Sequence, residues 1–368
     1  MRLLFVGTNR GPGGTESHFI SLAAAMADAG HDISAVVCPD DYIDQALAAD
    51  GRVRRFAACF ERTADLRATR AVIQAARAVR PDYLVGSFAR ESWPTALVGR
   101  ALGIPVVLFR HLDEHFSPQT ARLLPRLVHR VVAPSEFLRQ RIIDRGVVPA
   151  RTAVLFNSID SSVFHPDALA RVRTREQLGF VDGDVIVGFV GRLESKKGVH
   201  MLVLALDAAM ARCPQLRALW IGSGKEGAKV ETAITKSRHH ARHVRLPWSV
   251  DLPAYYAAMD MLAFPSIGSE AFGRVAVEAQ ACGVPVLASR TGGVPETLLA
   301  GQTGVLLPPG DVTAWADALV AIAGDAGARA RMGAAGRRFV CEAFDGHRIA
   351  RDFERLLRGE TQTPLVTR

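Results

Sequence analysis

The sequence lacks the features that mark secreted and membrane-spanning proteins. Its five cysteines are widely spaced and include no Cys-x-x-Cys pair, so we expect neither a disulfide framework nor a zinc site. No stretch reaches the roughly 18 apolar residues that a membrane span needs, and the first residues show no signal-peptide pattern. These absences favour a cytoplasmic protein that does not cross a membrane.

Lysine is scarce as well. Only five of the 45 basic residues are lysines, and 37 acidic residues leave a net charge of +8. We interpret the excess of arginine, together with many alanines, as codon bias of a GC-rich bacterial genome. A hydrophobic content of 49% with 22% charged residues is typical of a folded soluble protein. The length of 368 residues suits two domains.

Two nucleotide-binding signatures are also missing from the glycine-rich loop that follows the first apolar run. The loop has no Gly-x-Gly-x-x-Gly spacing, which counts against a nicotinamide oxidoreductase. It has no Gly-Lys-Ser/Thr ending either, which counts against an NTPase. Glycines before a helix start still favour close approach of an anion, so we predict that Gly13, Gly14 and Thr15 border a ligand cleft. A plain tight turn is the alternative.

Short apolar runs alternate with helical patterns along the chain, which predicts an α/β fold. Two such series are separated by the turn-forming residues Asn157–Pro166, and a last helical pattern spans Arg337–Arg358, with Gly346 as the expected break. We therefore predict an N-terminal domain at 1–160, a C-terminal domain at 161–340, and a final helix and tail at 341–368. The expected strands are Leu3–Val6, Ile33–Val37, Tyr83–Val85, Val106–Phe109, Val131–Ala133 and Val154–Leu155, then Val185–Val190, Ala218–Ile221, Val244–Leu246, Met261–Ala263, Val286–Ala288 and Gly304–Leu306.

A glycine-flanked basic loop follows the first strand of the second series. It places Arg192 and Lys197 after a strand end, where ligands of open α/β sheets bind. An arginine can bind two phosphate oxygens at once, and a lysine adds a point charge. The loop is therefore predicted to hold a diphosphate, and a solvated basic loop is the alternative.

The segment Pro265–Pro285 carries two carboxylates on either side of an expected helix start. Glu270 precedes the helix that begins near Gly273, and Glu278 lies roughly 8 Å farther along the helix axis. The helix start itself favours a phosphate. We predict that one glutamate holds sugar hydroxyls and the other a ribose. The alternative is a surface Glu270 and a Glu278 that pairs with an arginine.

Together these motifs resemble those of the retaining GT-B glycosyltransferases of family 4. The Gly222-Ser-Gly-x-Glu226 turn and the Gly292–Glu296 segment add to the resemblance, which extends from Gly11 to about Phe344. It implies two Rossmann-like domains that face each other across a cleft, with a C-terminal helix that crosses back to the first domain. It also implies transfer of a sugar, with retained configuration, from a nucleotide diphosphate sugar to a hydroxyl, without a metal or other cofactor.

The resemblance assigns roles to single residues. Glu270 would hold hydroxyls of the donor sugar, and His111, just after the strand Val106–Phe109, would touch the sugar near the transfer site. Both are candidate catalytic residues. Arg274 stands where the family frequently has an apolar residue, and we expect it to add a cation near the phosphates or to change which sugar fits. The implied donor-binding residues are Arg192, Lys197, Gly222, Phe272, Gly273, Arg274 and Glu278.

An arginine-rich stretch, Arg122–Arg151, carries seven arginines against Glu136 and Asp144, a balance of +5. Its start interleaves arginine with apolar residues, as an interfacial helix does, although a solvated helix face is the commoner cause. The partners that we expect are a nucleotide-sugar donor, a glycan or lipid-linked acceptor and the inner-membrane surface. Nucleic acid is not expected, because no binding motif accompanies the charge.

The product and the rival functions stay open. By analogy alone, a bacterial surface polysaccharide or lipopolysaccharide is the expected destination of the sugar. A sugar-nucleotide epimerase of the same fold and a non-catalytic nucleotide-sugar-binding protein are the alternatives.

Overall fold

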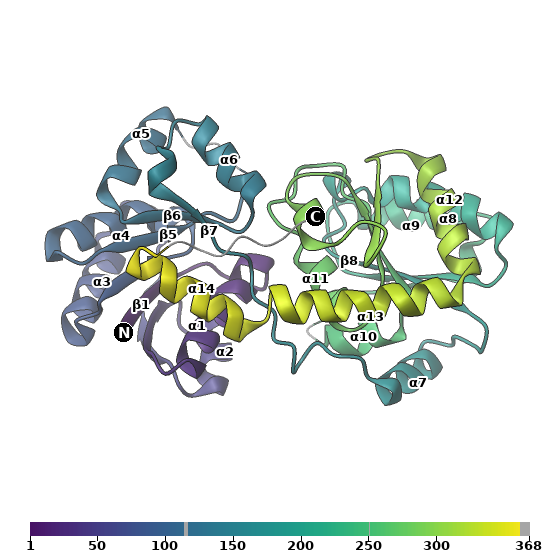
Figure 1. Ribbon diagram of the computed structural model, residues 1–368, viewed down its shortest axis with the longest axis horizontal. Helices are drawn as coiled ribbons and strands as arrows, with labels where there is room; N and C mark the ends of the chain where they lie inside the picture. Colours follow the sequence, from purple (N-terminus) through teal and green to yellow (C-terminus); the bar gives the residue numbers. More distant parts are fainter. Residues whose placement is uncertain (114–116, 250, 361–368) are drawn as a thin grey trace. The chain divides into compact units, whose positions relative to one another are not determined.

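The computed structural model describes residues 1–113, 117–249 and 251–360, which form two compact units. The first unit contains Met1–Ser158 together with the C-terminal segment that begins at Phe344, and the second contains Ile159–Ala343. The sequence-based boundaries at 160 and 340 fall close to this division. Figure 1 shows the helices and strands of both units.

The first unit is built on a parallel sheet, in which the described residues give seven strands in the order β3-β2-β1-β4-β5-β6-β7. The strand order reverses between β1 and β4, which is where open α/β sheets bind ligands. The strands are β1 (Arg2–Gly7), β2 (Asp32–Val37), β3 (Arg54–Ala57), β4 (Tyr83–Gly86), β5 (Val106–Phe109), β6 (Arg130–Ala133) and β7 (Thr152–Val154). The helices are α1 (Gly14–Asp28), α2 (Tyr42–Asp50), α3 (Leu66–Val79), α4 (Ala89–Leu102), α5 (Pro118–Leu127), α6 (Glu136–Asp144), η1 (Pro149–Arg151) and α14 (Gly346–Arg358).

Helices cover both faces of this sheet, which explains why its inner strands are apolar throughout. On one face, α1, α2 and α14 share a core with residues such as Phe5, Val85 and Val107. On the other, Thr95 of α4 packs near Gly86 and Leu108. The last helix therefore belongs to the core of the first unit, as the resemblance implied.

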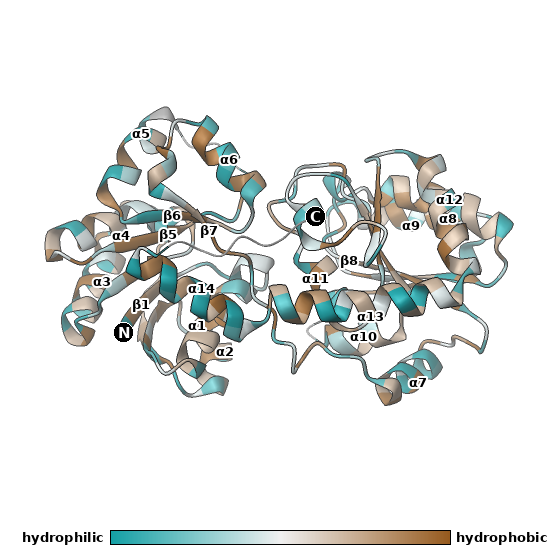
Figure 2. Ribbon diagram, viewed as in Figure 1, coloured by the Kyte–Doolittle hydropathy of each residue, from teal (hydrophilic) through white to brown (hydrophobic). Residues whose placement is uncertain are grey.

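The C-terminal helical pattern divides into α13 (Ala326–Ala343) and α14. The break lies at the expected place. The Asp345 carboxylate accepts a hydrogen bond from the His347 backbone N–H at 3.0 Å and so caps the new helix. Phe353 of α14 is fully buried, and Tyr83 donates a hydrogen bond to the Leu357 carbonyl. Figure 2 shows the matching alternation of hydrophobic and hydrophilic residues around α14.

The second unit has a parallel sheet as well, with the order β10-β9-β8-β11-β12-β13 among the described residues. Its strands are β8 (Val185–Val190), β9 (Leu216–Ile221), β10 (His243–Leu246), β11 (Met261–Phe264), β12 (Val286–Ser289) and β13 (Gly304–Leu307). Its other elements are α7 (Ala168–Gln177), η2 (Ser195–Lys197), α8 (Val199–Arg212), α9 (Gly227–Lys236), η3 (His240–Arg242), α10 (Leu252–Ala258), α11 (Arg274–Ala281), η4 (Val294–Thr297), α12 (Val312–Gly324) and α13.

Two apolar layers enclose the second sheet. On one face, Leu202 of α8, Val230 of α9 and Trp315 of α12 pack against strand residues such as Val187. On the opposite face, α10 and α11 pack on strand residues such as Leu262. The fold class predicted from the sequence, an α/β chain with two parallel sheets, is confirmed.

One expectation was wrong and one strand was missed. A disulfide joins Cys38 and Cys59, whereas the wide sequence spacing predicted no bridge. The two cysteines follow β2 and β3, which are neighbours in the sheet, so 21 residues of sequence separation become a Cα–Cα distance of 4.6 Å. Strand β3 was not predicted because it is a short edge strand that begins with the exposed Arg54 and Arg55.

The described residues contain no helix that is both long enough and apolar enough to span a bilayer.

Candidate functional site

The candidate donor site lies where four loops meet at the carboxyl edge of the second sheet. These loops follow β8, β9, β11 and β12, which are adjacent in the sheet. The backbone N–H groups of Ile267 and Gly268 both donate to the Lys196 carbonyl at 2.9 Å, which joins the loops after β11 and β8. The Gly293 N–H donates to the Glu270 carbonyl at 2.8 Å and adds the loop after β12. The backbone thus fixes the loops that carry the predicted residues.

Two glycines permit this close packing. A Cβ atom at Gly292 would lie 2.1 Å from the Glu270 carbonyl oxygen, and one at Gly222 would lie 1.9 Å from the Gly191 carbonyl oxygen. Both glycines have positive φ, +57° and +149°. A side chain at either position would force the loops apart. Gly222 therefore shapes the site through its backbone.

Lys197 and Glu270 form the first polar group of the site. The Lys197 Nζ lies 2.7 Å from Glu270 Oε1, and the Ser266 hydroxyl donates to the same oxygen at 2.5 Å. Both charged side chains are less than one-fifth exposed, and Nζ also lies 5.7 Å from the centre of the Phe264 ring. A partly desolvated cation beside an oriented carboxylate suits a ligand that has an anionic group next to hydroxyl groups.

Glu278 is the centre of the second polar group. Its side chain is buried on the first turns of α11, where Arg274 Nε donates to Oε1 at 2.8 Å and the Tyr256 hydroxyl donates to Oε2 at 2.9 Å. Burial raises the pKa of Glu278, and the nearby Arg274 guanidinium opposes that rise. Burial also raises the pKa of the Tyr256 hydroxyl, so this group stays a hydrogen-bond donor.

The sequence left a functional and a structural interpretation open for each glutamate, and the structure gives a different outcome for each. Glu270 is partly buried and paired with Lys197, so it is not a plain surface residue. Glu278 does pair with an arginine, Arg274. The Nε of Arg274 is bonded to this carboxylate, and the expectation that Arg274 adds a cation near the phosphates or changes which sugar fits stays a prediction.

The side chains of the remaining predicted donor residues make fewer contacts in the site. Arg192 is 64% exposed and pairs with Glu194 at 3.1 Å, so its guanidinium can turn toward a ligand at small cost. Phe272 is buried, which leaves its backbone as the part that a ligand meets. Gly273 has φ +121° and forms the N-cap of α11, and it brings no side chain to the helix start. An anion can therefore approach that start closely.

In the first unit, His111 lies directly beyond β5 and is 8% exposed. Its ring stacks on Phe109 with 5.6 Å between centroids and meets His18 edge-on at 4.9 Å. Neither ring nitrogen of His111 has a hydrogen-bond partner within the described ranges. Burial lowers its pKa to about 3, with a further contribution from Arg110, so the ring is neutral at neutral pH.

A carboxyl group of the protein itself lies beside the glycine-rich loop of the first unit. Gly14 begins α1, and the Glu16 carboxylate lies in the first turn, where Asn9 donates to it. A Cβ atom at Gly13 would be 2.4 Å from a Glu16 oxygen. The carboxylate therefore occupies part of the space at the helix start that the sequence assigned to a ligand anion. That Gly13, Gly14 and Thr15 border a cleft stays a prediction.

Three further polar residues were not predicted. Ser266 and Tyr256 hold the two glutamates, and nothing in their sequence neighbourhood indicates that role. Glu91 is buried in the first turn of α4, just beyond β4, and accepts a hydrogen bond from the Thr8 hydroxyl at 3.3 Å. Burial raises its pKa to about 8. An acidic residue after a buried strand was the signal that could have revealed Glu91.

Most arginines of the Arg122–Arg151 stretch have partners within the first unit. Arg145 and Arg141 pair with Asp113 at 2.6 and 3.6 Å, and Arg139 pairs with Glu136 at 2.6 Å. Arg130 and Arg151 donate to backbone carbonyls. Only Arg122 and Arg126, on α5, are exposed without such a bond among the described residues. The stretch is thus a set of structural contacts with a basic helix at its start.

Comparison with known proteins gives matches along most of the chain. The family model described as Glycosyltransferase Family 4 matches residues 12–163, and the model described as Glycosyl transferases group 1 matches residues 171–339. Among curated relatives, the GDP-mannose-dependent alpha-(1-6)-phosphatidylinositol monomannoside mannosyltransferase of Mycolicibacterium smegmatis is 32% identical over 297 residues. That match covers 77% of this chain and 76% of the relative.

A second curated relative and a solved structure also match the chain. The D-inositol 3-phosphate glycosyltransferase of Corynebacterium glutamicum is 31% identical over 266 residues, or 68% of this chain and 63% of the relative's length. Among solved structures, Anabaena HepE in complex with UDP and glucose aligns with a TM-score of 0.84 at 26% identity. That alignment covers 98% of this chain and 100% of HepE.

Proposed function

The chain belongs to the family 4 glycosyltransferases, and we propose that it moves a sugar from a nucleotide diphosphate sugar to an acceptor hydroxyl. One observation carries the proposal. Glu270 with its partner Lys197, the start of α11 and Glu278 follow each other at one edge of the second sheet, so a carboxylate, an anion-binding helix start and a second carboxylate come in that order. This order matches the sugar, diphosphate and ribose of such a donor.

In this proposal the donor diphosphate lies at the start of α11, with Lys197 and Arg192 as its cations. Negative charge develops on the leaving diphosphate as the bond to the sugar breaks, and fixed positive groups stabilise it most in a partly dry site. Glu270 holds sugar hydroxyls and so fixes the anomeric carbon. The neutral His111 ring supplies an uncharged hydrogen-bonding group for the donor sugar. We expect the anomeric configuration to be retained, as the family resemblance implies.

We propose that transfer needs no metal ion. Lys197, Arg192 and the helix start would do the electrostatic work that a divalent cation does in other transferases. Activity should persist in EDTA. An activity that disappears in EDTA and returns with Mn²⁺ or Mg²⁺ would contradict this part of the proposal.

The direct test is an assay of UDP-, GDP- and ADP-sugars, first by thermal shift and then with acceptors. Octyl glycosides serve as simple hydroxyl acceptors, and phosphatidylinositol is a second choice because the name of one relative contains it. We expect the donor to raise the melting temperature and nucleoside diphosphate to appear together with glycosylated acceptor. An epimerase would convert the sugar nucleotide without acceptor, and a binding protein would release no nucleotide.

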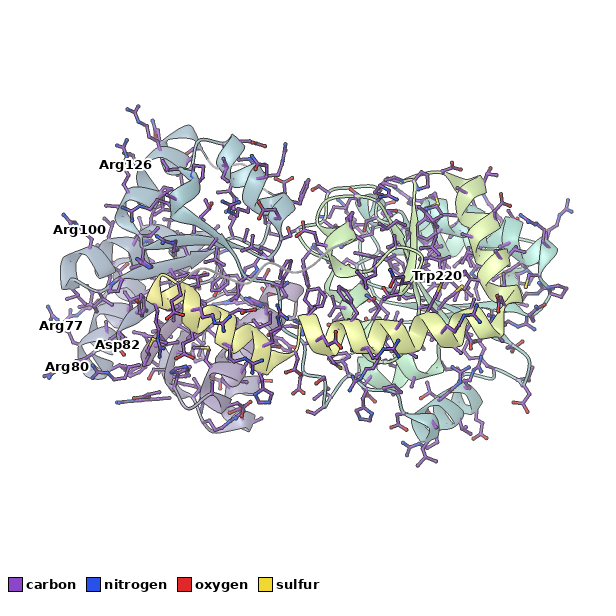
Figure 3. All side chains as sticks on the ribbon, in the orientation of Figure 1. Arg77, Arg80, Asp82, Arg100, Arg126 and Trp220 are labelled. Atoms are coloured by element: carbon purple, nitrogen blue, oxygen red, sulfur yellow. A yellow bond between two sulfur atoms is a disulfide. The ribbon has the colours of Figure 1, made fainter. Side chains whose placement is uncertain are left out.

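The acceptor side of the proposal includes the cytoplasmic-membrane surface and a lipid-linked glycan acceptor. The neighbouring helices α3, α4 and α5 carry exposed arginines, and the one acidic residue on them, Glu91, is buried. Arg77, Arg100 and Arg126 make no ion pair among the described residues, and Figure 3 shows them, with Arg80, directed away from the first unit. Leu97 and Leu123 are 54% and 46% exposed among these arginines. A basic face with exposed leucines suits an anionic lipid surface.

Cosedimentation with liposomes tests this surface. Vesicles that contain phosphatidylglycerol should bind the protein at low salt, and vesicles of phosphatidylcholine alone should not. Arg122→Glu with Arg126→Glu should weaken binding, whereas the matched charge change Arg173→Glu with Arg238→Glu in the second unit should not. Equal losses in the two double variants, or no binding at low salt, would remove the membrane from the proposal.

A further inference from the structure

Arg274 and Tyr256 hold the buried Glu278 from two different helices. Arg274 lies four residues before Glu278 on α11 and donates to Oε1, while Tyr256 on α10 donates to Oε2. Each carboxylate oxygen therefore has its own donor. Two donors on separate elements fix both the rotation and the tilt of the carboxylate plane.

The held carboxylate still has capacity for a ligand. A carboxylate has about four acceptor positions, and Arg274 and Tyr256 use two of them. One position on each oxygen remains, and the oxygens lie on the same planar group. Two adjacent hydroxyls of a ribose present two donors with matching spacing, so a diol fits this arrangement better than a single hydroxyl.

The arginine also maintains the charge that such binding needs. Glu278 is 4% exposed, and burial of an unpaired carboxylate favours its neutral form. The Arg274 guanidinium is itself only 14% exposed and cannot lose its proton under ordinary conditions. The pair is therefore screened little by solvent. Without the guanidinium, the carboxyl group would lose the cation that favours its ionised form.

We infer that Arg274, together with Tyr256, is a positioning residue that orients the Glu278 carboxylate toward the ribose hydroxyls of the donor nucleotide. Arg274 then acts on the nucleotide through Glu278 and is not a direct ligand of the diphosphate. This inference rests on the proposed donor site. It predicts that the contribution of Arg274 to nucleotide affinity depends on the ribose hydroxyls.

Calorimetry with ribose and deoxyribose nucleotides tests the inference. UDP and GDP, each beside its 2′-deoxy counterpart, would be titrated into the wild type and Arg274→Met, a change that keeps an unbranched side chain. We expect Arg274→Met to lose about ten-fold in affinity for the ribonucleotide and less than two-fold for the deoxynucleotide. Tyr256→Phe keeps the ring in the core and should show the same ribose dependence with a smaller loss.

The results that would overturn the inference differ from those that would overturn the proposed function. Equal losses for ribonucleotide and deoxynucleotide, together with an unchanged affinity for the free nucleoside, would make Arg274 a phosphate ligand and overturn the inference alone. Wild-type protein that binds none of these nucleotides would overturn the proposed function, and the inference with it. Thermal melts of each variant reveal a folding defect, and Arg274→Lys is the conservative variant because the lysine keeps a cation at this position. If Arg274→Met and Tyr256→Phe melt like the wild type and bind both nucleotides with wild-type affinity, the inference is wrong.

Discussion

The two units use the same architecture but treat the polar groups beyond their strands in opposite ways. In the second unit, Lys197 pairs with Glu270 and Arg274 pairs with Glu278. In the first unit, burial lowers the pKa of His111 to about 3 and raises that of Glu91 to about 8. Both of these side chains are therefore neutral near pH 7.

This difference indicates which part of the donor and acceptor each unit can recognise. A partly exposed pair such as Lys197 and Glu270 can exchange a protein partner for a phosphate or a hydroxyl group. Neutral buried groups bind neutral hydroxyls and repel nothing, so they suit an acceptor sugar or the uncharged part of a donor. A parallel sheet alone decides neither property. The side chains at its carboxyl edge do.

The largest expected effect comes from removal of the cation in the second unit. Lys197→Met should lower kcat/KM for the donor sugar nucleotide by about 10²–10³-fold, since a positive group beside the leaving diphosphate is lost. Lys196→Met is the matched control, because this lysine is 55% exposed and pairs with Glu194. Steady-state kinetics with a fixed acceptor measures both variants. Similar losses in the two would show that Lys197 has no special position.

The neutral state of Glu91 can be tested through stability. The pKa of Glu91 in the folded protein, about 8, is above the ordinary value of 4.5 for an exposed glutamate, so the folded state binds more protons between these values. The contribution of Glu91 to stability is then complete below about pH 4.5 and is lost as pH rises toward 8.

Glu91→Gln removes this titration. Relative to the wild type, the variant should gain stability between pH 5 and pH 8, on the order of a few kcal/mol. Urea unfolding at the two pH values measures the change, and Glu61→Gln, at an exposed position, is the control. A constant difference between wild type and Glu91→Gln would mean that Glu91 is already ionised in the folded protein.

A smaller effect should appear in the pH dependence of nucleotide binding. Burial raises the pKa of Glu278, Arg274 and Tyr256 act against that rise, and Cys282 is a further titratable neighbour whose own pKa Glu278 helps to raise. Arg274 stays charged, and burial keeps Tyr256 and Cys282 protonated, with the pKa of Cys282 raised to about 12. Glu278 is therefore the group among them that titrates on the acid side.

Affinity for the nucleoside diphosphate should thus fall as pH decreases through the raised pKa of Glu278. The fall should begin at a higher pH than an exposed glutamate would give. Calorimetry from pH 5 to pH 8 measures it, and Glu278→Gln should flatten the profile. A wild-type profile as flat as that of the variant would mean that the carboxylate does not contact the ligand.

Much of the fold could be predicted from the sequence because burial on both faces leaves long apolar runs. Strands β5 and β8 have the predicted bounds, and the boundary between the helices α13 and α14 lies next to the predicted break. Strand β3 carries two exposed arginines at the sheet edge, so its sequence gives no apolar signal. The Cys38–Cys59 bridge depends on strand order, which spacing along the chain does not reveal.

The candidate site divides in the same way. Glu270, Glu278 and Lys197 could be predicted because they stand at fixed places relative to a strand end and a helix start. Their partners could not, since Ser266 and Tyr256 come into contact with them only through loop closure and helix packing. For the arginine-rich stretch, the sequence overstated how many arginines are available to a partner. Charge counted along the chain does not tell which arginines, such as Arg145, are bonded within the fold.

In the proposed function the donor lies along α11, with its sugar near Glu270 and its ribose near Glu278. Calorimetry of the nucleoside diphosphate with Glu270→Ala and Glu278→Ala tests it most directly. We predict that Glu278→Ala weakens binding by about 1–3 kcal/mol, because a charge-assisted hydrogen bond is lost. Glu270→Ala should leave binding unchanged or slightly tighter, since this ligand has no sugar and Lys197 loses a competing carboxylate. If Glu270→Ala weakens binding as much as Glu278→Ala does, the donor does not lie along this helix as described.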